Sequence, residues 1–416
     1  MEREVMVHAD VEGLPVFVGR LWVRVRNGRE TASFEYDRSW LRRPDSYSLE
    51  PALSIGPGAF HTRKALFGAI SDSAPDRWGR VLLRRGEIRR ARMEKRAPRT
   101  LFESDFLLLV DDELRAGALR FRAGRDGPFL AEPRPGRVPP LVDLGRLLSA
   151  CKRVTRRDEL DEDLRLLIGP GSSLGGARPK AAVRDRDGGP AIAKFPHADD
   201  DRDVVLWEAV ALALADGAGI AVSDWRIERV AGRRVLVVRR FDRRGGRRVP
   251  FLSAMSMLGA ADNERRSYLE VADALRSHGA APRRDLKELW RRVVFSVLVS
   301  NTDDHLRNHG FLYERGLGWR LSPAFDLNPT PSDERARVLA TNIDEYDGTA
   351  SLELALATAG YYGLGQLEAR RIAGEVGRET GGWREVAERM GATRRESDRM
   401  ESAFSHADLE RALGLG

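Results

Sequence analysis

The sequence has little cysteine and no long hydrophobic run, and each shortage excludes a class of protein. Its one cysteine, Cys151, cannot form an internal disulfide, and a zinc site built from several thiolates is excluded as well. The longest apolar stretches, 293–299 and 106–110, fall far short of the roughly 18 residues that a membrane span needs. The first residues carry acids where a secretory signal has a basic and then an apolar segment. We therefore expect a cytoplasmic protein without a membrane partner.

Lysine is also scarce, although the chain is basic. Lysine and arginine total 70 against 63 acidic residues, a net charge of +7 that permits nucleic acid or other acidic partners without demonstrating them. Arginine pairs recur with acids nearby and lack the interleaved aromatics of a nucleic-acid stacking platform, so we expect mostly solvated faces. We interpret a retained lysine as a mark of chemistry that arginine cannot do. The lysines are Lys64, Lys95, Lys152, Lys180, Lys194 and Lys287.

The length of 416 residues predicts two or three domains. Alternating segments at 16–25 and 33–36, separated by the turn signal Asn27-Gly28, predict an antiparallel β start. The segment 67–85 resembles a helix start, with Asp72, Ser73 and Pro75 as the signal. We expect a β-rich subdomain over 1–130 and a proline-rich linker over 131–140.

The rest of the chain predicts a small α+β lobe followed by a helical one. Residues 141–245 contain a glycine-rich loop, strands at 191–195 and 233–241, and a helix over 203–218. Residues 246–416 turn to helical patterns, at 268–277, 285–299 and much of 351–413. The predicted fold class is therefore α+β.

The α+β lobe holds candidates for a nucleotide site. The segment 169–180 supplies glycines, among them Gly175 and Gly176, whose backbone amides can approach an anion, although an ordinary surface turn would look the same. Lys194 lies in Ala191-Ile-Ala-Lys-Phe, which is similar to the strand whose lysine contacts ATP phosphates in kinases, and Glu208 is its expected helix partner. Lys180 is a second candidate cation.

The most informative segment is 297–312, where an apolar helix runs into a polar cluster. Asp303 and Asn308 repeat the interval between the catalytic aspartate and asparagine of protein kinases, and Asp326 follows in Phe-Asp-Leu. Asn308 and Asp326 would hold Mg²⁺, and Asp303 would accept the proton of the acceptor hydroxyl. Alternatively, these residues are helix caps and turn formers. His305 and His309 have the spacing of a metal pair, but we expect His305 to order the loop through hydrogen bonds.

Together these motifs resemble the HipA-type serine/threonine kinases, the toxin components of bacterial toxin-antitoxin modules. The resemblance spans most of the chain. It is carried by Ala74-Pro-Asp-Arg-Trp-Gly79, Ser172-Ser-Leu-Gly-Gly-Ala-Arg-Pro-Lys180, Ala191-Ile-Ala-Lys-Phe-Pro196, Arg240-Phe-Asp-Arg243, Asn301-Thr-Asp-Asp-His-Leu-Arg-Asn308 and Leu321-Ser-Pro-Ala-Phe-Asp326. The chain departs from the family pattern at Arg307, often a lysine there, and at Arg239, a glutamate in some members.

The resemblance implies a HipA-like kinase fold with ATP in a cleft. It assigns Lys194 to ATP, Asp303 to the base, Asn308 and Asp326 to magnesium, and Ser173 to an autophosphorylated position that switches the enzyme off. Arg239 and Phe241 would flank the adenine. The implied partners are a serine or threonine protein substrate, among family members an aminoacyl-tRNA synthetase, and a helix-turn-helix antitoxin through which the chain would meet nucleic acid. Two alternatives stay open: a catalytically weak corepressor, and a small-molecule kinase.

Overall fold

The computed structural model describes residues 2–124, 126–131, 139–168, 176 and 178–415. The chain forms two compact units, one made of residues 1–199 and 228–252, the other of 200–227 and 253–416. Ser173, Gly175 and most of the expected linker lie outside the described residues. The expected domain boundaries stay predictions. No described helix combines the length and hydropathy that crossing a membrane requires.

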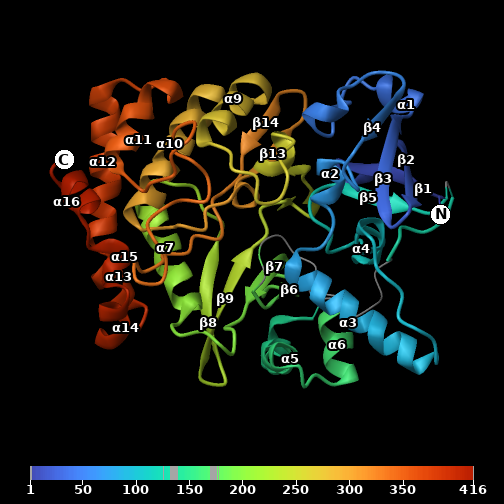
Figure 1. Cartoon of the computed structure of the whole chain (residues 1–416), viewed down its shortest axis with the longest axis horizontal. Helices are drawn as coiled ribbons and strands as arrows, with labels where there is room; N and C mark the ends of the chain where they lie inside the picture. The colour runs from blue at the N-terminus through green and yellow to red at the C-terminus, as the bar shows by residue number, and fades with distance from the viewer. Residues whose placement is uncertain (1, 125, 132–138, 169–175, 177, 416) are drawn as a thin grey trace. The chain divides into compact units, whose positions relative to one another are not determined.

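The first unit begins with an antiparallel sheet of strand order β4-β3-β2-β1-β5 (Figure 1). Asn27 and Gly28 both adopt positive φ, 51° and 71°, which is the geometry of a tight hairpin turn, and they join β2 to β3 as the sequence predicts. Every second residue of β3 is more deeply buried, Phe34 completely, so one face of the sheet packs inward. The strands are β1 (Glu2–Val11), β2 (Leu14–Arg26), β3 (Arg29–Tyr36), β4 (Ala59–Thr62) and β5 (Leu119–Arg122).

Helices follow within the same unit. The longest, α3, starts within the segment predicted as a helix start, and the Asp76 side chain caps it by accepting the Gly79 N–H at 2.8 Å. The helices are α1 (Arg38–Leu41), α2 (Gly68–Ser71), α3 (Arg77–Met93), α4 (Glu103–Leu109), α5 (Leu144–Arg156) and α6 (Asp161–Ile168), with 3₁₀ turns η1 (Pro51–Leu53) and η2 (Leu141–Asp143).

A second sheet has the order β6-β7-β9-β8, and the boundary between the two units runs through β8. Its apolar side chains join those of α5 and α6 in one core that includes Leu147, Leu167, Val183 and Val235. The predicted strands at 191–195 and 233–241 are found as β7 and β9. The strands are β6 (Lys180–Arg184), β7 (Pro190–Lys194), β8 (Trp225–Val230), β9 (Arg233–Arg239), β10 (Arg243–Arg244), β11 (Arg247–Arg248) and β12 (Phe251–Ser253).

The second unit is mainly helical, and it also carries the β13–β14 hairpin (Figure 1). Trp207 of α7 packs against Trp383 and Phe404, which stack on each other with ring centroids 4.7 Å apart. The elements are α7 (Val204–Gly217), α8 (Ala254–Met257), α9 (Tyr268–His278), α10 (Pro282–Leu298), η3 (Leu306–Asn308), β13 (Gly310–Glu314), β14 (Gly318–Leu321), α11 (Leu352–Thr358), η4 (Ala359–Tyr362), α12 (Gln366–Gly381), α13 (Trp383–Arg389), α14 (Arg394–Arg399), α15 (Glu401–Phe404) and α16 (Ala407–Leu413).

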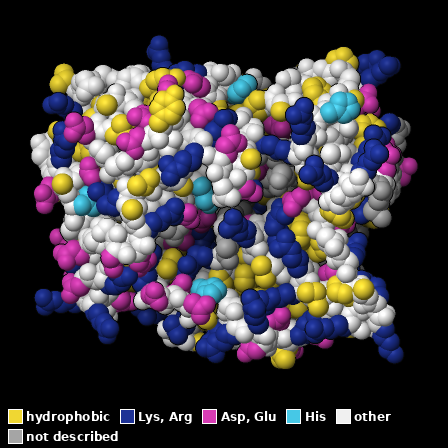
Figure 2. All heavy atoms as spheres, viewed as in Figure 1, with side chains coloured by type: hydrophobic (Ala, Val, Ile, Leu, Met, Phe, Trp, Pro, Cys, Tyr) yellow, Lys and Arg dark blue, Asp and Glu magenta, His cyan; other side chains and the backbone are white. Residues whose placement is uncertain are grey.

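Basic and acidic side chains are interspersed on the face of the molecule drawn in Figure 2. Many arginines form ion pairs with nearby acids, for example Arg291 with Glu375 at 2.9 Å and Arg411 with Glu353 at 2.8 Å.

Candidate active site

The polar cluster after α10 is anchored by buried residues. Ser300 adopts positive φ at 51° directly after the helix, and Asn301 and Thr302 are completely buried. The next side chain points outward: that of Asp303 is 62% exposed and lies 3.2 Å from the Arg335 guanidinium. The loop therefore exposes the Asp303 carboxylate to solvent directly after two buried residues.

The neighbouring carboxylate, Asp304, faces the interior. Its Oδ1 lies 3.0 Å from Nε2 of His309, and its Oδ2 accepts hydrogen bonds from the Tyr268 hydroxyl and, at 2.9 Å, from the Ser296 hydroxyl. Burial by itself raises the pKa of Asp304, but the charge and hydrogen bond of His309, with the two hydroxyl donors, bring it below its usual value. Asp304 is thus an ionised structural centre of the loop, a role that the sequence did not reveal.

Asn308 lies five residues after Asp303 and is held by it. The Asn308 Nδ2 donates to the Asp303 backbone oxygen at 3.2 Å, which fixes the direction of the amide. The other amide atom, Oδ1, is buried and has no hydrogen-bond donor within the described part of the chain. Asn308 lines a small pocket together with Asp304, His309 and Phe325. A buried oxygen without a donor has the chemistry of a ligand for a hard cation.

Asp326 is positioned by a relay that starts in the same loop. The Asn301 Oδ1 accepts the Asn328 N–H at 3.0 Å, and the Asn328 Nδ2 donates to the Asp326 backbone oxygen at 3.0 Å. Asp326 has positive φ at 55°, which a residue other than glycine adopts rarely and mostly where surrounding contacts enforce it. Asn301 and Asn328 hold the backbone around Asp326, a function that their positions in the two motifs did not disclose.

Lys194 and Lys180 belong to the first unit. Lys194 ends β7 and is the direct partner of Lys180 in the antiparallel register with β6. The Lys180 side chain is 3% exposed, and its ammonium lies 2.8 Å from an oxygen of Asp76. It also donates to the Gly176 backbone oxygen at 3.3 Å, and Gly176 has positive φ at 57°. Their roles toward a nucleotide stay predictions.

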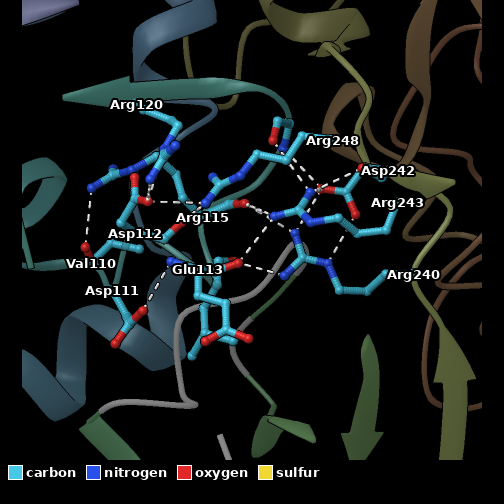
Figure 3. A network of polar contacts seen from close by, with 12 residues as sticks. Val110, Asp111, Asp112, Glu113, Arg115, Arg120, Arg240, Asp242, Arg243 and Arg248 are labelled. Carbon is cyan, nitrogen blue, oxygen red and sulfur yellow. Dashed lines mark hydrogen bonds and ion pairs between the residues drawn. The ribbon is translucent and has the colours of Figure 1, made fainter. Parts of the chain in front are cut away.

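Arg240, which lies between the expected hinge residues Arg239 and Phe241 in the sequence, belongs to a buried ion network (Figure 3). Arg239 pairs with Asp187 and is partly exposed, and Phe241 packs against Phe251 at 6.0 Å between ring centroids. Between them, Arg240 donates to Asp242 and to the Leu114 backbone oxygen, at 2.7 Å in each case. The network fastens the segment after β9 to the turn after α4.

The side chain of Asp242 is 1% exposed and accepts the Gly117 N–H at 2.8 Å. Burial alone raises its pKa, but the charges of Arg240 and Arg243 outweigh this and hold it well below the usual value. Arg115 donates to the backbone oxygens of Ser73, Leu107 and Val110, and burial lowers its pKa to about 9. The buried arginines shown in Figure 3 thus pair with carboxylates and with carbonyl groups around the end of α4.

Two further predicted site residues lie in the second unit. Glu208 is buried on α7, with 6% of its surface exposed. His305 donates its backbone N–H to the Asp303 oxygen at 2.8 Å, whereas its ring Nδ1 is buried without a hydrogen-bond partner among the described residues. The loop is thus ordered at this position by the backbone of His305. Their part in nucleotide binding stays a prediction.

The side chains of Asn308 and Asp326 are of the kind that binds a magnesium ion. Asn308 contributes the oxygen without a donor, and Asp326, whose backbone the asparagine relay holds, contributes a carboxylate. Oxygen donors of this kind suit Mg²⁺, and a carboxylate with an amide oxygen is the donor set that protein kinases use. The role of Asp303 toward a substrate hydroxyl stays a prediction.

The chain is similar in sequence to several known proteins. A family model described as HipA-like C-terminal domain matches residues 172–395. A protein of Sinorhizobium fredii named "Putative kinase Y4mE" is 28% identical over 258 residues, which cover 55% of this chain and 58% of that protein. A "Putative kinase" of Haemophilus influenzae is 32% identical over 84 residues, 19% of this chain and 24% of that protein. The chain thus matches little more than half of the first relative's length and a quarter of the second's.

A solved structure is similar over nearly the full length. A chain in the complex of Shewanella oneidensis MR-1 HipA, HipB and operator DNA superposes with a TM-score of 0.68 at 18% identity, covering 99% of this chain and 97% of that one. The predicted fold class, α+β with a β-rich N-terminal part and a helical C-terminal part, is confirmed.

Proposed function

The chain belongs to the HipA-like C-terminal domain family, and from this we propose that it is an ATP-dependent kinase that phosphorylates serine or threonine residues of a protein. The observation that carries the proposal is the Asn308 side chain. Its amide is fixed by Asp303, and its buried Oδ1 has no donor within the described residues. A turn former or a helix cap has no need of such an oxygen, whereas a metal ligand does.

In this proposal each residue of the loop has one task. Asp303 orients the acceptor hydroxyl and takes its proton, for which its 62% exposed side chain is suited. Asn308 and Asp326 hold Mg²⁺, which when bound neutralises phosphate charge. Lys194 binds the phosphates, supported by Lys180 and Gly176, and Glu208 also contributes to nucleotide binding. The segment at Arg239 and Phe241 contacts the adenine.

We further propose the biological setting of the family for this chain. The fold likeness to a HipA chain crystallised with HipB and operator DNA supports an antitoxin partner, through which this protein would meet DNA. An aminoacyl-tRNA synthetase is the substrate that the resemblance suggests. Autophosphorylation at Ser173 would add about −1.5 to −2 charges close to the ATP phosphates and empty the site.

The experiment that tests the proposal is phosphoryl transfer from γ-labelled ATP. The purified chain is incubated with labelled ATP and Mg²⁺, alone and with a cell extract, and labelled products are identified by mass spectrometry. We expect phosphoserine or phosphothreonine on a protein, and no label with the Asp326→Ala variant. Label on a small molecule would replace the protein substrate by a small one. If no label appears and calorimetry detects no binding of MgATP, the chain acts by binding other macromolecules.

A further inference from the structure

The motif Ala74-Pro-Asp-Arg-Trp-Gly79 has no role in the proposed reaction, yet it contacts Lys180, one of the predicted nucleotide-binding residues. One oxygen of Asp76 caps α3 through the Gly79 N–H at 2.8 Å, and the other lies 2.8 Å from the Lys180 ammonium. Two residues later, the Trp78 indole Nε1 donates to the Lys180 backbone oxygen at 2.9 Å. The start of α3 therefore contacts both the ammonium group and the backbone oxygen of Lys180.

Lys180 lies in a place where a cation needs such support. It is the register partner of Lys194, and directly opposed residues of an antiparallel pair point to the same face with Cβ atoms about 4.5–5.5 Å apart. The register therefore places both ammonium groups on the same face of the sheet. Like charges on directly opposed residues destabilise the pairing of the two strands. The side chains of Lys180 and Asp76 are 3% and 8% exposed, so water does little to screen their charges.

The contacts leave the Lys180 ammonium in one defined position. The ammonium forms an ion pair with Asp76 at 2.8 Å and donates to the Gly176 backbone oxygen at 3.3 Å. A buried ammonium that loses its carboxylate is uncompensated, and it moves toward water or disturbs the surrounding packing. The carboxylate of Asp76 thus decides where the charge of Lys180 is held.

We propose that Asp76 is a positioning residue for nucleotide binding, which acts by fixing the Lys180 ammonium beside Lys194. The inference rests on the proposed kinase function, since it assumes that Lys180 contributes to binding ATP phosphates. It also gives the N-terminal region a direct part in the nucleotide site.

Asp76→Asn separates the charge of Asp76 from its role as a helix cap, because asparagine caps helices as well as aspartate does. We expect the dissociation constant for MgATP, measured by calorimetry, to rise about tenfold, while kcat at saturating ATP stays within about threefold of the parent. Asp37→Asn is the matched control, because Asp37 caps α1 through the Ser39 N–H at 2.8 Å, and it should leave both values unchanged. Unchanged or tighter binding in Asp76→Asn overturns the proposal.

A double-mutant cycle tests whether Asp76 acts through Lys180. Lys180→Met keeps most of the side-chain volume and removes the charge. If the proposal holds, MgATP binds Asp76→Asn/Lys180→Met no more weakly than Lys180→Met alone, because the second change removes an interaction that is already lost. Additive losses in the double variant would mean that Asp76 acts on the nucleotide by another route.

A measurement without nucleotide keeps the two proposals distinguishable. Acetic anhydride labels accessible lysines, and with few lysines in the chain each site is resolved by mass spectrometry. Lys180 should be protected in the parent and labelled several times faster in Asp76→Asn, whereas Lys152 should react equally in both. Equal protection of Lys180 refutes the positioning role. If the protection changes but the parent binds no MgATP, the proposed kinase function fails while the Asp76–Lys180 pair stands.

Discussion

Asp303 and Asp304 are neighbours in the sequence with opposite surroundings, and their substitutions should separate chemistry from stability. Asp303→Asn should lower phosphoryl transfer by about 10²–10⁴-fold and leave the dissociation constant for MgATP nearly unchanged, since a base acts on the acceptor hydroxyl. Its exposed side chain contributes little to stability. Single-turnover transfer and calorimetry check the two values.

Asp304→Asn serves as the contrast, because it leaves the Tyr268, Ser296 and His309 groups without their ionised partner. We expect it to lower the free energy of unfolding by about 3 kcal/mol or more.

Equal transfer rates for Asp303→Asn and the parent would remove Asp303 from the mechanism.

Glu50 gives a prediction about pH. It is 4% exposed and accepts the Ala69 N–H, and burial, with the charge of Asp72, raises its pKa to about 7. Between its unfolded value near 4.5 and about 7, the unfolded chain releases a proton that the folded chain keeps, so stability falls as the pH rises.

The variant Glu50→Gln cannot ionise, so it should escape this loss. Its free energy of unfolding relative to the parent should increase by about 3 kcal/mol between pH 4 and pH 8, as measured by urea unfolding. Glu113→Gln, at a more exposed side chain, is the control. Parallel pH curves for the parent and Glu50→Gln would contradict the buried, protonated state.

At the scale of elements, local patterns in the sequence were sufficient where one segment decides its own structure. The alternation of 33–36, the Asn27-Gly28 turn and the alanine-rich 203–218 segment predicted β3, the hairpin and α7, because periodicity and turn chemistry are local properties. The Asp303–Asn308 interval likewise predicted the loop that brings the two together.

Polar contacts between distant segments were not predictable in this way. Tyr268 and Asp304 are 36 residues apart, and Trp78 and Lys180 are 102 residues apart. Nothing in either segment alone shows which partner it will meet, since only the packed chain brings them together. The residues that contact Asp304 and Lys180 could therefore be identified only from the structure.

The asparagine relay from Asn301 to Asp326 leads to a prediction about the two segments that it joins. Asn301→Ala leaves the Asn328 N–H without its acceptor, and an unsatisfied buried group costs about 1–3 kcal/mol. Part of this cost should appear as looser positioning of Asp326. We expect the Mg²⁺ concentration for half-maximal ATP binding to rise about tenfold, measured by calorimetry across a magnesium series. Thr330→Ala removes a hydroxyl that bonds only locally to the Asn328 backbone oxygen, and it should shift the value little.

At the scale of the whole molecule, the proposed function requires Lys194, Asn308 and Asp326. A ligand that binds only the folded chain stabilises it by mass action, by about 2.7 kcal/mol at a concentration 100 times its dissociation constant. MgATP should therefore raise the melting temperature of the entire chain. ATP with EDTA should not do so, because the metal and its ligands are then missing.

Variants of the proposed nucleotide and magnesium ligands should abolish that stabilisation. Lys194→Ala and Asp326→Ala each remove a charge that the nucleotide requires, so differential scanning fluorimetry should show no MgATP-dependent shift in either protein. Asp262→Asn is the control, since Asp262 is an exposed carboxylate that pairs with Arg307 at 2.8 Å, and it should keep the full shift. If Asp326→Ala loses the shift and Lys194→Ala keeps it, the magnesium ligands are correct and the phosphate cation must be sought elsewhere in the first unit.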